Sequence, residues 1–131
     1  MARQMADWAE AALFEEGRKA SSRPVDLVHL SRYTLGEREL EQEVLELFCT
    51  QATIYLERLR QAGSDKDWKD AAHSLKGSAS AIGAWRAAEA AERAEAMSGE
   101  ALAQGRALRL REIEFAVREA EAYIDTLLED R

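Results

Sequence analysis

Residues 65–82, with the sequence DKDWKDAAHSLKGSASAI, contain the pattern that decides the fold. An α-helix advances by about 100° per residue, and on such a helix the apolar residues of this stretch form one stripe about 100° wide. The members of the stripe are Trp68, Ala71, Ala72, Leu75, Ala79 and Ile82. The stretch therefore predicts a helix that is buried along one side. His73 lies about 150° from the centre of the stripe, so we expect its imidazole to be exposed to solvent.

Small and positively charged residues surround His73 on the face that we expect to be exposed. The neighbours on this face are Lys66, Lys69, Lys76, Gly77 and Ser80. Glycine inside a helix costs about 1 kcal/mol relative to alanine, and core packing cannot explain a glycine on an exposed face. We therefore interpret Gly77 as clearance for a partner that approaches the backbone beside His73. Lys76 adds a mobile cation that would suit an anionic group on the ring.

The stretch from His73 to Gly83, HSLKGSASAIG, resembles the motif of the histidine-containing phosphotransfer (HPt) domain. In that motif a histidine is followed by leucine after two residues, by lysine after three, and by glycine after four and after ten. All of these residue types occur here at the same spacing. A looser resemblance covers about residues 24–98, whereas residues 1–23 fall outside it.

The resemblance implies a phosphorelay intermediate of two-component signalling. His73 would accept a phosphoryl group from the aspartate of a receiver domain and pass it to the aspartate of another receiver. Lys76 would stabilise the charge of the phosphoryl group, and Gly77 would admit the partner. Further partner-binding candidates are Lys66, Lys69, Ser78 and Ser80. The implied partners are the receiver domains of response regulators and also a hybrid sensor kinase. We expect Mg²⁺ on the receiver and no cofactor or metal on this chain.

Two other classes of function stay open. A helical adaptor would dock on a receiver domain or a kinase without accepting phosphate, and a purely structural bundle would need no partner. His73, Lys76 and Gly77 together favour the carrier over the adaptor, and a structural bundle would not explain an exposed Gly77. The seven glycines are scattered, so the sequence has no glycine-rich phosphate loop. We therefore expect a carrier that works only with receiver partners and has no ATP-binding kinase activity.

Length and composition favour one all-α domain outside the membrane. The 131 residues include one proline and carry a net charge of −7, which argues against nucleic acid as a partner. Cys49 is the single cysteine, so we expect a small core residue in a reducing compartment. The sequence has no run of 18 apolar residues, and residues 1–20 carry charges where a signal peptide would need an apolar centre. We expect a cytoplasmic monomer.

Apolar periodicity and glycine-marked turns predict an up-down-up-down antiparallel four-helix bundle formed by residues 24–131. The expected long helices cover about residues 37–62, 65–82 and 84–97, and a last helix that ends near residue 127. The last helix begins at either Gly99 or Gly105. Apolar residues cover nearly 200° of the helix at 37–62, which suggests that this helix is buried on two sides.

Two shorter helices are expected before the bundle. Asp26 can cap a helix that runs to about Thr34 and ends at Gly36. This helix contains His29, which lacks lysine and glycine neighbours and which we interpret as structural. Residues 1–23 comprise an amphipathic helix and a polar linker. The apolar residues of that helix are Met5, Trp8, Ala9, Ala12 and Leu13. It could dock on the bundle, pair with another copy or bind a partner.

Overall fold

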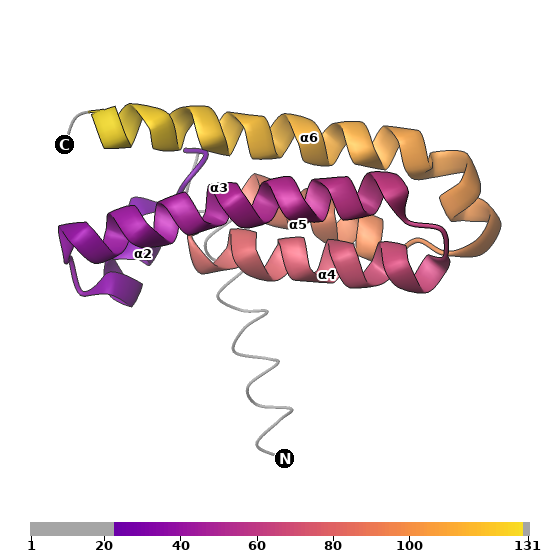
Figure 1. Ribbon diagram of the computed structural model, residues 1–131, viewed down its shortest axis with the longest axis horizontal. Coiled ribbons are helices and arrows are strands. Elements are labelled where there is room, and N and C mark those ends of the chain that lie inside the picture. The colour runs from indigo at the N-terminus through magenta and orange to yellow at the C-terminus, as the bar shows by residue number, and fades with distance from the viewer. Residues whose placement is uncertain (1–22, 130–131) are drawn as a thin grey trace, which may run out of the picture.

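The structure is a computed structural model that describes residues 23–129. Within this range the chain forms five α-helices and no β-strand (Figure 1). Their bounds are Leu27–Thr34 for α2, Arg38–Gln61 for α3, Asp65–Ala81 for α4, Trp85–Glu95 for α5 and Gly99–Glu129 for α6. The amphipathic helix expected around residues 5–13 lies outside the described residues.

Helices α3 to α6 pack as an antiparallel bundle, which confirms the predicted fold class. α3 packs on α4, α4 on α5 and α5 on α6, and α6 closes the ring by packing on α3. Short connections at residues 62–64, 82–84 and 96–98 reverse the chain between consecutive helices. α2 is an additional short helix that packs against α3. Within residues 23–129, no helix is both long and apolar enough to span a bilayer.

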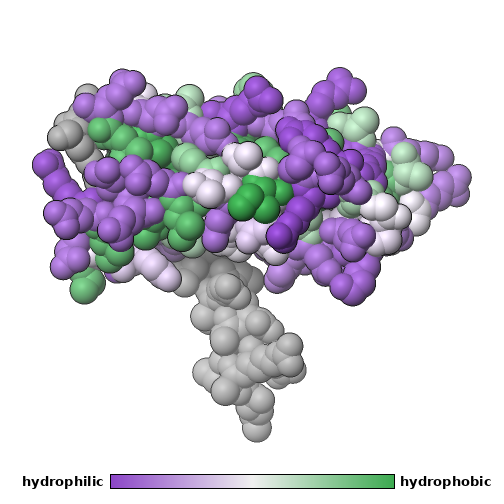
Figure 2. Space-filling view, in the orientation of Figure 1, coloured by the Kyte–Doolittle hydropathy of each residue, from purple (hydrophilic) through white to green (hydrophobic). Residues whose placement is uncertain are grey.

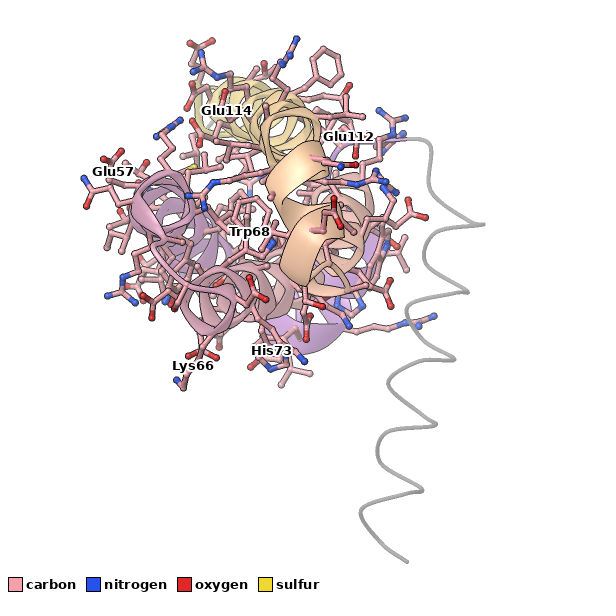
Figure 3. All side chains as sticks on the ribbon, turned by 90° about the vertical axis from the view of Figure 1, so that its right-hand side faces the viewer. Glu57, Lys66, Trp68, His73, Glu112 and Glu114 are labelled. Carbon is pink, nitrogen blue, oxygen red and sulfur yellow. The ribbon has the colours of Figure 1, made fainter. Side chains whose placement is uncertain are left out.

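The apolar stripe of α4 fills the centre of the bundle, as predicted. Trp68, Ala72, Leu75 and Ala79 are fully buried. The indole Nε1 of Trp68 donates a hydrogen bond to the carbonyl oxygen of Ala94 in α5, at 2.8 Å. Figure 3 shows Trp68 inside the ring of helices. This hydrogen bond joins a fully buried side chain of α4 to one particular residue of α5, and so links the register of the two helices.

The alanines of α5 bring this helix close to α4. All five are buried: Ala87, Ala88, Ala90, Ala91 and Ala94. Because the distance between two helix axes depends on the side chains at their contact, alanines permit a closer approach than leucines would. The acidic residues at the edge of α5 therefore lie within reach of the exposed face of α4.

The two ends of α2 confirm one predicted cap and correct the other. Asp26 Oδ1 accepts hydrogen bonds from the backbone N–H groups of Val28 and His29, both at 3.1 Å, and so caps α2. At the other end of α2, the sequence predicts Gly36 as the terminating residue. Leu35 already adopts the left-handed conformation there, with φ 56°, and Gly36 follows with φ 77°. The turn thus needs two left-handed residues, of which glycine supplies only the second.

The last helix begins at Gly99, the earlier of the two predicted starts. The backbone N–H of Gly99 donates to Asp65 Oδ2 at 2.8 Å, which satisfies a donor that the first turn of a helix leaves unpaired. Gly105 lies inside α6. Apolar residues spaced three or four positions apart along this helix are buried: Ile113, Val117, Ala120 and Ile124.

Part of the apolar surface of α3 is exposed, so the expectation that it is buried on two sides is wrong along much of the helix. The exposed fractions are 54% for Leu47, 45% for Ile54 and 37% for Leu40. α2 has 8 residues and α3 has 24, so the short helix can cover only a part of the long one. Figure 2 shows hydrophobic residues among the hydrophilic ones on the viewed face of the molecule.

Cys49 of α3 is half-buried and packs against the core, which agrees with its prediction as a small core residue. Burial raises the pKa of its thiol to about 11, and the carboxylates of Glu121, Asp125 and Glu46 contribute to the rise. The thiol is therefore protonated at neutral pH and is a poor nucleophile.

Candidate functional site

His73 lies on the outer face of α4, as the sequence predicts. Its side chain is 73% exposed. The next residue towards the N-terminus, Ala72, is fully buried, so the helix separates the imidazole sharply from the core. Figure 3 shows His73 and Lys66 at the outer edge of the bundle, on the opposite side of α4 from Trp68. The ring is thus accessible to another protein while a rigid helix holds its backbone.

Glu95, the last residue of α5, holds one nitrogen of the His73 ring. Glu95 Oε1 lies 3.0 Å from His73 Nδ1. An ionised carboxylate can only accept hydrogen bonds, so Nδ1 carries the proton and donates a hydrogen bond to Glu95. In the neutral ring Nε2 then keeps its lone pair. Nε2 has no hydrogen-bond partner among the described residues, which leaves it available as a nucleophile.

Lys76 lies one turn after His73 and faces the same helix, α5. Its Nζ is 3.7 Å from Glu92 Oε1, and its side chain is 33% exposed. Glu92 and Glu95 are three residues apart and therefore occupy one face of α5. Two acidic residues of α5 thus meet the two residues of α4 that the motif singles out, His73 and Lys76.

The sequence analysis missed both acidic residues because no local pattern marks them. Glu95 is 22 positions from His73 and lies in the next helix. Only the register between α4 and α5 brings them together, and that register follows from buried contacts such as the one between Trp68 and Ala94. Alignment of the apolar stripes of α4 and α5 in antiparallel orientation could have indicated this contact from the sequence.

The predicted cluster of three amines is less cationic than the sequence suggests. Lys66 Nζ pairs with Asp70 Oδ2 at 2.7 Å, and this hydrogen bond raises the pKa of Lys66. Lys76 is paired with Glu92. Lys69 is exposed and has no carboxylate partner within 4.0 Å among the described residues. Two of the three positive charges are therefore balanced within the chain.

The two glycines of the motif meet different surroundings. Gly77 is exposed, and a Cβ added there would meet nothing within 4 Å. Core packing therefore does not require Gly77, as expected. Gly83 has φ +74°, and an added Cβ would lie 2.7 Å from the Cβ of Asp26. Gly83 is thus required by the fold, because the backbone of the α4–α5 turn closely approaches the start of α2.

The two serines of the site are both partly buried. The hydroxyl of Ser78 donates to Gln51 Oε1 in α3, at 2.9 Å. Ser78 therefore belongs to the contact between α3 and α4. Ser80 is half-buried. Of the predicted residues, the structure places Lys76 beside α5 with His73, and turns Ser78 towards α3.

His29, the second histidine, is in a packing contact rather than in an open site. Its ring lies 4.9 Å from the ring of Trp85 in an edge-to-face arrangement. Trp85 Nε1 in turn donates to Asp26 Oδ2 at 3.0 Å. This chain of contacts ties α2 to the start of α5, in agreement with the structural role predicted for His29.

Among the described residues, no group of three or more His, Cys, Asp or Glu side chains could hold a metal ion. Whatever the site does, its described chemistry consists of an exposed imidazole, a carboxylate that orients it and a nearby ammonium.

Comparisons with known proteins point to one family. The family model of the Hpt domain matches residues 43–130. Among solved structures, the fold is similar to the crystal structure of histidine-containing phosphotransfer protein B (HptB) from Pseudomonas aeruginosa PAO1, with a TM-score of 0.76 and 19% sequence identity. That match covers 85% of this chain and 99% of the other. None of the curated proteins matches the sequence significantly.

Proposed function

Because the chain belongs to the Hpt domain family, whose role is histidine phosphotransfer in two-component signalling, we propose that His73 is the residue that carries the phosphoryl group. It takes the group from the aspartate of one receiver domain and gives it to the aspartate of another. The observation that carries the proposal is the state of the ring. The imidazole is exposed, its Nδ1 is held by Glu95, and its Nε2 has no partner among the described residues.

The transfer needs no base from this chain. The lone pair of Nε2 attacks phosphorus, the N–P bond forms, and the P–O bond to the receiver's aspartate breaks, so that the aspartate leaves as a carboxylate. The second transfer is the reverse of the first. Phosphoryl transfer of this kind depends mainly on in-line positioning and on stabilisation of charge. An exposed histidine on a rigid helix meets the first requirement.

Lys76 meets the second requirement, which is the stabilisation of charge. Gly77 allows the partner to approach the helix. The ammonium of Lys76, one turn from His73, stabilises the negative charge of the phosphoryl oxygens. Gly77 leaves open space beside the helix backbone, where the receiver can come close. Lys69 and Lys66 contribute to docking on the acidic surroundings of the receiver's aspartate, Lys69 more than the paired Lys66.

The partners and conditions follow from this chemistry. Receiver domains of response regulators, and the receiver of a hybrid sensor kinase, supply the aspartate and hold the Mg²⁺ that neutralises the transferred group. We further propose that the chain acts as a monomer in the cytoplasm. It is a carrier and not an ATP-binding kinase.

A relay with two receivers tests this function. One receiver domain is phosphorylated with a labelled small phosphodonor, freed of excess donor, and mixed with this chain and then with a second receiver. A carrier becomes labelled itself and then passes label to the second receiver. A helical adaptor would bind the receiver, for example in a titration calorimeter, without becoming labelled. Binding without label would therefore refute the carrier and support the adaptor.

A further inference from the structure

We propose that residues 1–16 dock as an amphipathic helix in the groove between α5 and α6, with Trp8 as the side chain that fills it. These residues lie outside the described part of the chain, whereas the groove that receives them lies inside it. The groove is away from His73, so this docking does not depend on the proposed phosphotransfer. Of the three roles that the sequence leaves open for the segment, the groove favours docking on the chain's own bundle.

The groove is open to solvent, has a volume of about 750 Å³ and runs between two ion pairs that join α5 to α6. At one end Arg86 of α5 binds Glu119 of α6 at 2.6 Å. At the other end Arg93 of α5 lies 3.5 Å from Glu112 of α6. Along both helices the apolar lining residues fall between these pairs: Ala90, Phe115 and Ala116. The groove thus has an apolar middle and charged ends.

The aromatic ring of Phe115 has little cover within the described part of the chain. Phe115 is 72% exposed, whereas Ala90 and Ala116 beside it are buried. An amphipathic helix binds such a groove by laying its apolar face into it. A large side chain between the two ion pairs would cover Phe115 and meet the alanines of both helices.

The α6 side of the groove has an excess of positive charge. Four arginines and four glutamates line the groove. Glu112, Glu114 and Glu119 each pair with an arginine. Arg111 and Arg118 are exposed, and neither has a carboxylate within 4.0 Å among the described residues. These two guanidinium groups therefore favour an acidic occupant.

The sequence of residues 1–16, MARQMADWAEAALFEE, has the matching chemistry. It contains a single arginine and four acidic residues: Asp7, Glu10, Glu15 and Glu16. On a helix, Glu15 falls about 20° beyond Trp8 at one edge of the apolar stripe, and Glu10 falls about 60° beyond Leu13 at the other edge. When the stripe lies in the groove, one of these carboxylates therefore faces the arginines of α6, whichever way the helix runs.

The chain enters the described structure at one end of the groove. Asp26 Oδ2 accepts a hydrogen bond from Nε1 of Trp85, the first residue of α5, and Arg86 follows directly. The expected linker at residues 17–23 spans up to about 23 Å when extended, whereas α5 from Arg86 to Arg93 is about 10 Å long. A tether this short gives an effective concentration on the order of millimolar. The tether therefore favours the chain's own segment over that of a second copy.

The exposed apolar residues of α3 are a less suitable surface for this segment. Leu40 and Leu47 are exposed, but the exposed carboxylates of Glu39, Glu43 and Glu46 lie close to them along the same helix. Like charges repel, so an acidic segment is disfavoured there.

Docking in the groove leaves the face of His73 open. α5 contacts His73 and Lys76 of α4 through Glu95 and Glu92, whereas its groove residues bind α6. Figure 3 shows Glu112 of the groove and His73 on different sides of the bundle. The docked segment and a protein bound at His73 would therefore occupy separate surfaces.

The test attaches a nitroxide to the full chain and measures the broadening of ¹⁵N-labelled backbone amides by NMR. Ala11→Cys carries the nitroxide, because residue 11 lies about 130° from the centre of the apolar stripe and its replacement keeps all the acidic residues. Cys49→Ala removes the chain's own thiol. We expect broadening at Ala90 and Phe115, and none at Leu47 of α3.

Charge reversal tests the electrostatic part of the docking. Arg111→Glu combined with Arg118→Glu should abolish the broadening, because the groove then repels the acidic segment. The further changes Glu10→Lys and Glu15→Lys should restore it, since the charges of groove and segment are then exchanged. Arg58→Glu, an exposed charge reversal on α3, is the matched control and should leave the broadening unchanged.

Replacement of aromatic residues within the segment tests the apolar part without altering the bundle. Trp8→Ser should abolish the broadening. Phe14→Ser removes an aromatic ring about 170° from the centre of the apolar stripe, and should leave the broadening in place. Transfer from a phosphorylated receiver should be equally fast in the unchanged chain and in Trp8→Ser, because the groove lies away from His73.

Absence of broadening at Ala90 and Phe115, or broadening that survives Trp8→Ser, would overturn the inference. A mixture of a nitroxide-labelled chain without ¹⁵N and a ¹⁵N-labelled chain without nitroxide tests for a second copy as the occupant. Broadening in that mixture would overturn docking on the chain's own bundle. The NMR measurement needs no phosphate, so a failure of the proposed phosphotransfer would leave its result unaffected.

Discussion

The ammonium of Lys76 lies 3.7 Å from the carboxylate of Glu92, so α5 already engages the cation beside His73 when no phosphoryl group is present. Both side chains are partly exposed, and ion pairs of this kind contribute only about 0–1 kcal/mol to stability. On the proposed function, Lys76 would therefore exchange Glu92 for phosphoryl oxygens at little cost. The pair would hold Lys76 close to the phosphoryl group that we propose on His73.

Replacement of Lys76 by alanine should slow transfer by roughly tenfold or more, because the phosphoryl oxygens lose a nearby cation. The melting temperature should change little, since the exposed pair with Glu92 contributes little to folding. Single-turnover transfer and thermal unfolding, measured on the same preparation, check both statements. Glu92→Gln is the matched control, which breaks the same pair but keeps the ammonium, and its transfer should be at least as fast as that of the unchanged chain. Equal rates for Lys76→Ala and the unchanged chain would contradict the role of Lys76.

Gly77 should respond to substitution in opposite directions in stability and in activity. Open space surrounds its Cα, and alanine is favoured over glycine inside a helix by about 1 kcal/mol, so Gly77→Ala should be more stable by up to that amount. Gly77→Gln should also keep or gain stability, yet it should obstruct the receiver and slow transfer by tenfold or more, as small misplacements can do. The thermal midpoint and the transfer rate of the two variants check this. An unimpaired rate for Gly77→Gln would mean that the partner does not approach over this residue.

Gly83 should behave in the opposite way to Gly77. Its φ of +74° costs a non-glycine residue about 1–2 kcal/mol, and an added Cβ would lie 2.7 Å from the Cβ of Asp26. We therefore expect Gly83→Ala to lower the free energy of unfolding by roughly 2 kcal/mol or more. Denaturant unfolding followed by circular dichroism measures this change, with Gly77→Ala as the control of opposite sign. If Gly83→Ala were as stable as the unchanged chain, the turn between α4 and α5 would have to differ from the one described.

The features that the sequence could predict are those that a single helix determines. The apolar stripe around Trp68 and Leu75 defines both the buried face of α4 and, by opposition, the exposed position of His73. The cap at Asp26 is equally local, since its partners are two and three residues away. Such features follow from helical periodicity and from the unpaired N–H groups of the first turn.

Features that depend on the register between helices could not be predicted in this way. Glu95 and Glu92 meet His73 and Lys76 across the α4–α5 contact, and Gln51 meets Ser78 across the α3–α4 contact. The exposure of Leu47 and Ile54 could not be predicted for the same reason. Apolar periodicity indicates which residues can be buried, but the length of the neighbouring helix decides which of them are.

The central claim is that His73 carries the phosphoryl group, and its most direct measurement is the site and chemistry of the label after incubation with a phosphorylated receiver. We expect label that is lost in acid and stable in alkali, as for a phosphorus–nitrogen bond. It should be absent from His73→Gln and fully retained in His29→Gln, whose histidine is in a packing contact with Trp85. Label that persists on His73→Gln, or that is stable in acid, would contradict the account.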